Sequence, residues 1–141
     1  MSFMTSDAIY ILLRFGLAIV IIGLGAFAYW LIHRRLLIRA RTGVSTLFST
    51  LPEKPVLVYF TTPDCAPCKT IQRPAINRVS HLLGGELEVV EIDATERPDL
   101  AKVWGVMSVP TTFVLDARGE ARYVNNGVAR AEKLLEQIQT L

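Results

Sequence analysis

The stretch Val56-Leu57-Val58-Tyr59-Phe60, with Cys65-Ala66-Pro67-Cys68-Lys69 shortly after it, decides the fold of this chain. The apolar, β-prone run predicts a buried strand over 56–60. After the cysteines, apolar residues recur at helical spacing and predict a helix over 69–83. The chain's only two cysteines therefore lie where a strand ends and a helix begins.

This position has chemical consequences for both cysteines. Cys65 would lie at the open N-terminal end of the helix, where unpaired N–H groups and the helix dipole favour a thiolate over a thiol. Cys68 is one turn further on, close enough to form a disulfide with Cys65. Pro67 lacks an N–H and suits a first turn, and we expect Ala66, Pro67 and Lys69 to support this turn. Two thiols at this spacing form a reversible two-electron switch, so no other cofactor is expected.

The cysteine pair has two other possible interpretations. Structural zinc needs about four ligands, and the chain offers only His33 and His81 besides, neither at ligand spacing. We therefore expect no metal site. Two unreactive core cysteines are the other possibility, because buried cysteines are common, but the position between strand and helix argues against it.

A long apolar segment precedes this region. Residues 8–32 are apolar except for Arg14, and the uninterrupted part, 15–32, is 18 residues long, the lower limit for crossing a bilayer. Tyr29 and Trp30 lie at its far end, as in an aromatic belt. A signal peptide cleaved at Ala26-Phe27-Ala28 is the alternative. The apolar run continues past that point and the first thirteen residues hold no Lys or Arg, so we predict an uncleaved, single-pass membrane anchor through residues 8–32.

Charge is divided unevenly along the chain. Residues 1–42 carry five arginines against Asp7 alone, a net charge of +4, whereas residues 43–141 carry ten basic and twelve acidic side chains, a net charge of −2. Four of the arginines follow the apolar segment, so the positive-inside rule places the C-terminal domain in the cytoplasm. Because Arg14 flanks the other end, an extracytoplasmic domain stays the alternative. The domain has no basic stripe with interleaved aromatics, so nucleic acid is not an expected partner.

The rest of the chain completes a predicted domain. We divide the sequence into an anchor (1–33), a basic juxtamembrane linker (34–42) and a folded domain (43–141). Residues 36–41 either continue the helix or form a first strand. In either case we expect Gly43 to interrupt this element, and a short helix to follow over 45–51. Further strands are expected over 87–93, 111–115 and 120–125, and helices over 98–104 and 129–141. Residues 117–119 form a tight turn and 126–127 a kink or bulge. The order (β)αβαβαββα predicts a central mixed sheet with helices on both faces.

This arrangement and its motifs resemble the thioredoxin family over roughly residues 36 or 43 to 141. The resemblance rests on Cys65-Ala66-Pro67-Cys68-Lys69 after an apolar strand, Glu91-Ile92-Asp93 at a strand end, Val109-Pro110-Thr111, the hairpin at Gly119, and Gly127. It implies an α/β fold, a thioredoxin-like three-layer α/β/α domain with a central mixed sheet, here preceded by one transmembrane helix.

The resemblance also implies residue roles. Family members exchange a disulfide with those of client proteins. By resemblance, Cys65 is the attacking thiolate and Cys68 the resolving thiol. Pro110 matches the family's cis-proline facing the cysteine pair, and the backbone of Val109 would offer a strand edge to the client. Partners would then be client proteins with disulfides and an electron-donor reductase or thiol partner.

The sequence departs from the family pattern near the cysteines. Asp64 replaces the usual tryptophan and Ala66 the usual glycine. Tyr59 stands where many members hold a buried acid, and tyrosine is a poor base at neutral pH, which leaves water or Lys69 to handle the proton of Cys68. Pro74 comes one residue later than the usual helix proline.

The leading hypothesis is a membrane-tethered thiol–disulfide oxidoreductase that acts mainly as a protein-disulfide reductase. Pro67 beside the second cysteine resembles the reducing members of the family rather than the strongly oxidising ones. The alternatives are a non-catalytic thioredoxin-like module that docks a partner at the membrane, and a metal carrier that uses the dithiolate.

Overall fold

The structure of the chain is a computed structural model that describes residues 3–48 and 52–141. The elements, in order, are α1 (Phe3–Leu47), β1 (Val56–Thr61), a π-helical segment η1 (Cys68–Gln72), α2 (Arg73–Leu83), β2 (Glu88–Asp93), α3 (Pro98–Trp104), β3 (Thr111–Leu115), β4 (Ala121–Asn126) and α4 (Ala131–Gln139). The chain divides into two compact units, Met1–Arg34 and Arg35–Leu141.

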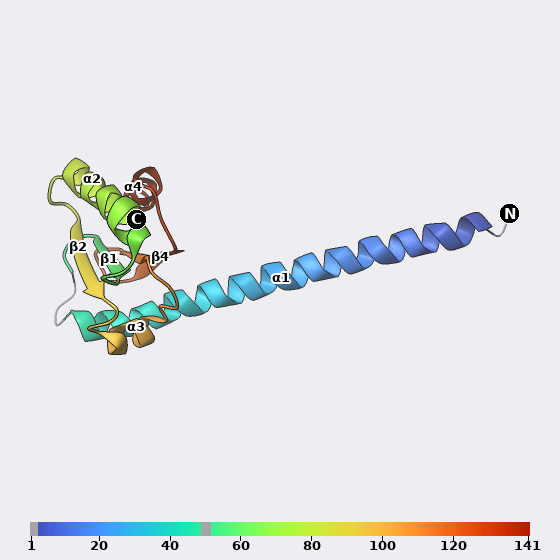
Figure 1. Cartoon of the computed structure of the whole chain (residues 1–141), viewed down its shortest axis with the longest axis horizontal. Helices are drawn as coiled ribbons and strands as arrows, with labels where there is room; N and C mark the ends of the chain where they lie inside the picture. The colour runs from blue at the N-terminus through green and yellow to red at the C-terminus, as the bar shows by residue number, and fades with distance from the viewer. Residues whose placement is uncertain (1–2, 49–51) are drawn as a thin grey trace. The chain divides into compact units, whose positions relative to one another are not determined.

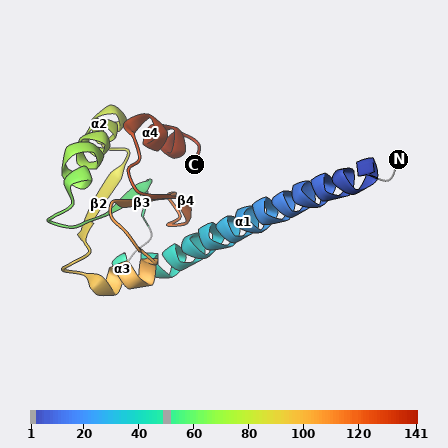
Figure 2. The ribbon, with the colours of Figure 1, turned by 45° about the vertical axis from the view of Figure 1, so that its right-hand side comes forward.

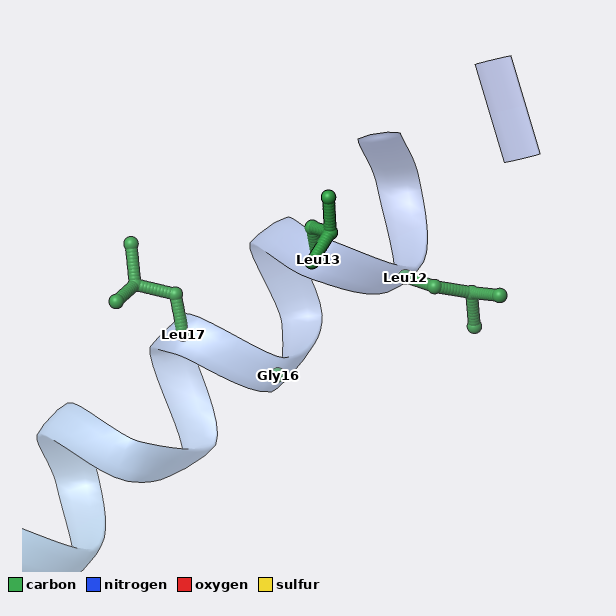
Figure 3. A pocket seen from close by; sticks show the side chains of 4 residues that line it. All are labelled: Leu12, Leu13, Gly16 and Leu17. Atoms are coloured by element: carbon green, nitrogen blue, oxygen red, sulfur yellow. The ribbon is translucent and has the colours of Figure 1, made fainter. Parts of the chain in front are cut away.

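The N-terminal unit is helical and exposes its apolar side chains. Among the described residues, one helix is long and apolar enough to cross a membrane, and it lies near the N-terminus. Around Gly16, the side chains of Leu12, Leu13 and Leu17 project from the helix and line a shallow apolar hollow (Figure 3). An exposed apolar surface of this extent is unusual in a protein that water surrounds on every side.

The second unit is built on a mixed sheet. In the described part of the chain the strand order is β2-β1-β3-β4, with β1 parallel to β2 and antiparallel to β3, and β3 antiparallel to β4. Tyr59 in the middle of β1 lies opposite Glu91 on one side and Thr112 on the other. The predicted central mixed sheet is confirmed. The optional first strand over 36–41 is not formed, because these residues are helical.

Helices cover both faces of this sheet, which confirms the three-layer α/β/α architecture (Figure 1). One face, here called the aromatic face, packs against α3 and the C-terminal turns of α1. Its buried residues include Val58, Phe60, Trp104, Phe113 and Val44. The other, here called the cysteine face, packs against α2 and α4, which lie side by side (Figure 2). Its buried residues include Tyr59, Cys65, Cys68, Ile76 and Leu134. Alternation along β1 sends successive side chains to opposite faces.

Gly43 does not interrupt α1, contrary to the sequence-based expectation. The helix runs through it to Leu47, so the helix expected over 45–51 is the end of α1, and residues 49–51 lie outside the described residues. Gly43 is required for a different reason. A Cβ at this position would lie 2.3 Å from Nε1 of Trp104, so only glycine lets the indole pack directly against the helix backbone.

The turns of α1 before Gly43 belong to the core of the second unit. Leu36 and Ala40, which the sequence assigned to a basic linker, are buried on the aromatic face. Gly105 ends α3 in the left-handed conformation, with φ +70°, and a Cβ at this position would lie 3.1 Å from the Leu36 side chain. Where the independently folding domain begins stays a prediction, which truncation tests below.

The last two elements differ slightly from expectation. Helix α4 begins at Ala131, because the backbone of Arg130 is extended. The irregularity in the β3–β4 pairing falls between Val114 and Leu115, whereas Gly127, with φ +90°, turns the chain after β4 ends. The three residues after Gly127 therefore form a connecting loop, and Ala129 in this loop hydrogen-bonds to Gln72 of the cysteine-bearing helix.

Candidate redox-active site

A disulfide joins Cys65 to Cys68 at the carboxyl end of β1, with an S–S distance of 2.00 Å and a Cα–Cα distance of 5.3 Å. The chain leaves the strand at Thr61 and turns, and the N–H of Cys65 donates to the carbonyl of Thr62 at 3.2 Å. The N–H of Lys69 then donates to the carbonyl of Cys65 at 3.3 Å, which starts the helix. The strand-to-helix junction predicted from the sequence thus holds both sulfurs.

The two cysteines differ in their surroundings. Cys65 keeps 8% of its surface exposed, whereas Cys68 keeps none. The backbone N–H of Cys68 donates to Sγ of Cys65 at 3.3 Å. Ala66 and Pro67, which follow Cys65, are exposed, as are Asp64 and Lys69. The sulfur at the edge of the protein is therefore the one that a backbone donor supports.

The helix after the cysteines begins with a wide turn. Residues Cys68–Gln72 are π-helical, and the N–H of Arg73 donates to the carbonyl of Cys68, five residues earlier. A single extra residue in a helix is commonly absorbed as such a π-bulge, often at a functional site. Pro74, one residue later than the family pattern, lies directly after this turn. The wide turn thus begins at the second cysteine, and α2 continues from Arg73 in α-helical geometry.

Tyr59 is buried beneath the second cysteine. Its hydroxyl donates to the carbonyl of Cys68 at 3.3 Å. Burial raises the pKa of the Tyr59 phenol above its ordinary value, and the nearby carboxylate of Glu91 also raises it, against the lowering effect of a hydrogen bond with Thr61 and of the Arg73 charge. The phenol is therefore uncharged at neutral pH. Its hydrogen bond orients the backbone carbonyl of Cys68.

The proline segment lies against the same cluster. The Val109–Pro110 peptide bond is cis. Val109 packs against the apolar cluster that contains both cysteines, and Pro110 is buried. The carbonyl of Pro110 accepts the N–H of Gly127 at 2.8 Å. The structure thereby brings together the cysteines, Val109, Pro110 and the loop after β4, which are far apart in the sequence.

Gln72 is a residue of the site that the sequence analysis missed. Its side chain is fully buried, and it exchanges two hydrogen bonds with the backbone of Ala129: Nε2 donates to the carbonyl at 3.1 Å, and Oε1 accepts the N–H at 2.7 Å. A signal was present, because Gln72 lies four residues before Ile76 and seven before Val79, on the face that packs inward. Its neighbour Ile71, an apolar residue in the region expected to be helical, is about half exposed.

The described residues include no group of three or more His, Cys, Asp or Glu side chains that could hold a metal ion. The two cysteines are bonded to each other. The chemistry that the site offers is thus that of a disulfide, with one sulfur near the surface.

Comparison with known proteins agrees with this geometry. The family model for thioredoxin matches residues 44–140, more than half of the chain. The chain belongs to the thioredoxin family. Among its relatives, the thioredoxin of Bacillus subtilis (strain 168) is 37% identical over 83 residues, which cover 59% of this chain and 78% of that protein. A thioredoxin-like protein of Synechocystis sp. is 35% identical over 86 residues, or 61% and 80% of the two chains.

Solved structures show the same fold. A mutant thioredoxin from Halobacterium salinarum matches with a TM-score of 0.56 and 26% identity, over 62% of this chain and 74% of that one. A thioredoxin-2 described as a component of malaria parasite protein secretion machinery matches with a TM-score of 0.59 and 18% identity, over 62% and 84%. Membership of the thioredoxin family, together with the Cys65–Cys68 disulfide, identifies the protein as a thiol–disulfide oxidoreductase.

Proposed function

We propose that this thioredoxin-family protein is a membrane-tethered reductant of protein disulfides, in which Cys65 attacks the client and Cys68 releases it. The observation that carries the assignment is the asymmetry of the two sulfurs: Cys65 is the one with exposed surface and a backbone N–H donor, and Cys68 has no exposed surface. A hydrogen bond to sulfur favours the thiolate, the form that attacks disulfides.

The reaction moves two electrons to the client. The thiolate of Cys65 attacks one client sulfur, the client S–S bond breaks, and the other client sulfur leaves as a thiolate that takes up a proton. The thiol of Cys68 loses its proton and attacks Sγ of Cys65, which breaks the mixed disulfide and releases the second client thiolate. The Cys65–Cys68 disulfide remains, and an electron-donor reductase or thiol partner must reduce it before the next cycle.

Val109 and Pro110 are proposed to position the client chain. Val109 packs on the cluster that contains both cysteines, and a backbone beside a reactive sulfur is suited to hold an extended peptide through main-chain hydrogen bonds. Ala66, Pro67 and Lys69 are proposed to support the turn that carries the disulfide. A reducing role is supported by Pro67, since the proline before the second cysteine resembles the reducing members of the family.

The tether is proposed to be α1 through residues 8–32. Its support is the length and apolar composition of the helix and the exposure of side chains such as Leu12, Leu17 and Ile22. Arg34 lies over the ring of Trp30, 5.3 Å from its centroid, an arrangement suited to the boundary between hydrocarbon and water. The arginines after the apolar segment favour a domain in the cytoplasm.

Insulin reduction tests the catalytic proposal. We expect the wild-type protein with dithiothreitol to accelerate insulin precipitation, and Cys65→Ser and Cys68→Ser each to abolish the acceleration. Cys68→Ser should trap clients as mixed disulfides on Cys65, whereas Cys65→Ser should trap none. Equal trapping by the two variants would contradict the assigned roles. No acceleration by the wild-type protein would favour the docking module instead.

Membrane vesicles of known orientation test the tether and its sidedness. We expect the full chain to stay with the membrane after carbonate washing, and protease added to right-side-out vesicles to leave the domain intact. Cleavage in right-side-out but not in inverted vesicles would place the domain outside. Release by carbonate would contradict the membrane span.

A further inference from the structure

The side chain of Gln72 links the cysteine-bearing helix to the loop between β4 and α4. Gln72 is 0% exposed, and both of its polar atoms are used: Nε2 donates to the carbonyl of Ala129 at 3.1 Å, and Oε1 accepts the N–H of Ala129 at 2.7 Å. An amide that pairs with both backbone groups of one residue fixes that residue's position and orientation. A buried amide in a core-facing position is costly unless it is paired, so this pairing is a defined feature of the site.

The loop held by Gln72 is attached at a second point. The N–H of Gly127 donates to the carbonyl of Pro110 at 2.8 Å. Between these two attachments lies Val128, whose side chain is 41% exposed. Ala129 and Val109 pack in or against the same cluster as Cys65 and Cys68. Hydrogen bonds therefore connect the cysteine helix, the loop and the proline segment into one surface around the disulfide.

We propose that Gln72 is a positioning residue that holds the loop over residues 127–130 in place for protein clients. In this proposal a polypeptide bound at Cys65 extends over the neighbouring proline segment and this loop, whereas a small disulfide needs only the exposed part of Cys65. Gln72 is the last residue of the π-helical turn that begins at Cys68. The inference rests on the proposed function, because it names the surface by which that function selects protein disulfides.

The test compares protein and small disulfides as substrates of the full-length protein. Reduced wild-type and Gln72→Met proteins are mixed in single turnover with insulin or with hydroxyethyl disulfide. Methionine has a similar volume but neither of the two hydrogen bonds. We expect Gln72→Met to reduce insulin about tenfold more slowly, through weaker binding, and hydroxyethyl disulfide within about twofold of the wild-type rate, with the dithiol potential against glutathione unchanged.

Gln137→Met is the matched control. Gln137 in α4 also exchanges two hydrogen bonds, with Asn125 at 2.9 and 3.0 Å, but its partner is in β4. The Gln137→Met protein should be less stable than the wild type, as the Gln72→Met protein is. Its ratio of the insulin rate to the small-disulfide rate should equal that of the wild type. An equal fall of both rates in Gln72→Met, or an insulin rate unchanged by it, would overturn the inference.

Gln72→Glu supplies a rescue that a general loss of packing would not show. A protonated carboxyl can accept the N–H of Ala129 and donate to its carbonyl, as the amide does, but an ionised one cannot donate. Burial raises the pKa of the introduced carboxyl, so the substitution is tolerated at low pH and destabilises as the pH rises through that raised pKa. The rate ratio should approach that of the wild type toward pH 5 and depart from it toward pH 8. A ratio that does not change with pH would contradict the proposal.

Hydrogen exchange gives a readout that does not depend on any substrate. The amide of Ala129 should lose protection in Gln72→Met and keep it in Gln137→Met, because only the first removes its acceptor. If the wild-type protein reduces neither disulfide, the proposed function is wrong. In that case only the hydrogen exchange of the Ala129 amide tests whether Gln72 holds the loop. Unchanged protection of this amide in Gln72→Met would reject the inference.

Discussion

The two faces of the sheet are formed by the same strands but bury different kinds of side chain. On the aromatic face, the rings of Phe60, Trp104 and Phe113 lie with their centroids 4.9 to 6.0 Å apart, at the edge-to-face and tilted angles that aromatic pairs favour. On the cysteine face, the disulfide, Tyr59 and Gln72 lie among apolar side chains, and the two polar side chains have hydrogen-bond partners. The aromatic face therefore supplies stability by close packing, and the cysteine face holds groups that must keep an orientation.

The two faces also differ in whether their buried polar side-chain atoms have hydrogen-bond partners. Among the described residues, Nε1 of Trp104 is buried with no hydrogen-bond partner, a cost that the packing of a large ring can offset. Tyr59, on the opposite face, gives its hydroxyl to the carbonyl of Cys68. Changes to the aromatic face should thus act mainly through lost packing and lower the free energy of unfolding, whereas changes to the cysteine face should act through the hydrogen bonds that hold the backbone around the disulfide.

Removal of the early turns of the second unit should have the largest effect. A chain that begins at Gly43 lacks Leu36 and Ala40, which are buried on the aromatic face. We expect it to lose about 3 kcal/mol or more of unfolding free energy relative to a chain that begins at Arg35, through lost apolar burial and the resulting cavity. Urea denaturation of both chains measures the difference. Equal stabilities would show that the domain starts at Gly43, as the sequence predicts. They would contradict a stabilising contact between the turns of α1 before Gly43 and the aromatic face.

A pair of substitutions in the full chain sharpens this comparison. Leu36→Ala should destabilise by about 2 kcal/mol or more, whereas Ile38→Ala, at a position that is 54% exposed, should change stability little. The reduction potential should match that of the wild type in both variants. A shift of the potential in Leu36→Ala would mean that the two faces are coupled through the sheet.

Gly43→Ala should come next in size. The added methyl would lie 2.3 to 2.6 Å from three atoms of the Trp104 indole, so the ring or the helix must move. We expect a loss of about 2 to 3 kcal/mol, as for overpacked cores, and a change in tryptophan fluorescence. Gly16→Ala, where nothing lies within 4 Å of the added atom, is the control. An undiminished midpoint of thermal unfolding in Gly43→Ala would contradict the direct packing of Trp104 on α1.

Much of this arrangement could be predicted from the sequence, and the exceptions have physical causes. The strand before Cys65, the helix over 98–104 and the strand over 111–115 carry strong local signals, and the structure has all of them. Gly43 was expected to end a helix, because glycine is a poor helix former. The close approach of Trp104, 61 residues later, is a tertiary contact that no local pattern contains.

The disulfide of the site could be predicted from the sequence, whereas the hydrogen bonds that hold the surrounding backbone could not. The cysteine spacing and the turn indicated the disulfide, and Tyr59 was identified as a departure from the family pattern. The late position of Pro74 is a departure from the family pattern that predicts no particular helix geometry, and the structure has a π-turn just before it. The pairing of Gln72 with Ala129 joins residues 57 positions apart. The available signal is a polar residue, Gln72, at a helix position that faces inward. This signal does not indicate which residue forms hydrogen bonds with it.

Tyr59→Phe tests the cysteine face with a smaller expected effect. Loss of the hydroxyl removes one donor to the carbonyl of Cys68, which keeps the N–H of Arg73, so we expect a cost of about 1 kcal/mol at pH 7. Burial raises the Tyr59 pKa above its unfolded value. The associated stability is thus present below about pH 10 and is lost as the pH rises through the raised pKa.

The alkaline limb of the stability curve is the measurement. Wild type should lose stability there more steeply than Tyr59→Phe, so that the two curves converge. The rate of insulin reduction between pH 6 and 8 should keep its pH profile in the variant, because the phenol is not the base. A displaced profile would instead give Tyr59 a part in proton transfer.

Asp93→Asn should have the smallest effect, since Asp93 lies at the end of β2 and serves neither core. Its carboxylate accepts two hydrogen bonds from Thr95, from the hydroxyl and the backbone N–H, which lower its pKa. Stability from this pair is present above the unfolded pKa and is lost as the pH falls through the lowered folded pKa. Unfolding by urea between pH 2 and 5 should therefore show a shallower acid loss in the variant. An identical acid limb would mean that the pair contributes nothing.

The position of β2 at the margin of the sheet affects how copies of the protein meet. In the described part of the chain β2 pairs with β1 alone, so its other side presents unsatisfied backbone donors and acceptors that could recruit a foreign strand. Glu88, Glu91 and Asp93 make up half of this strand. Glu91 is paired with Arg73, so Glu88 and Asp93 supply the charge that two copies brought edge to edge would oppose, and such charges on an edge strand disfavour aggregation where molecules are crowded on a surface.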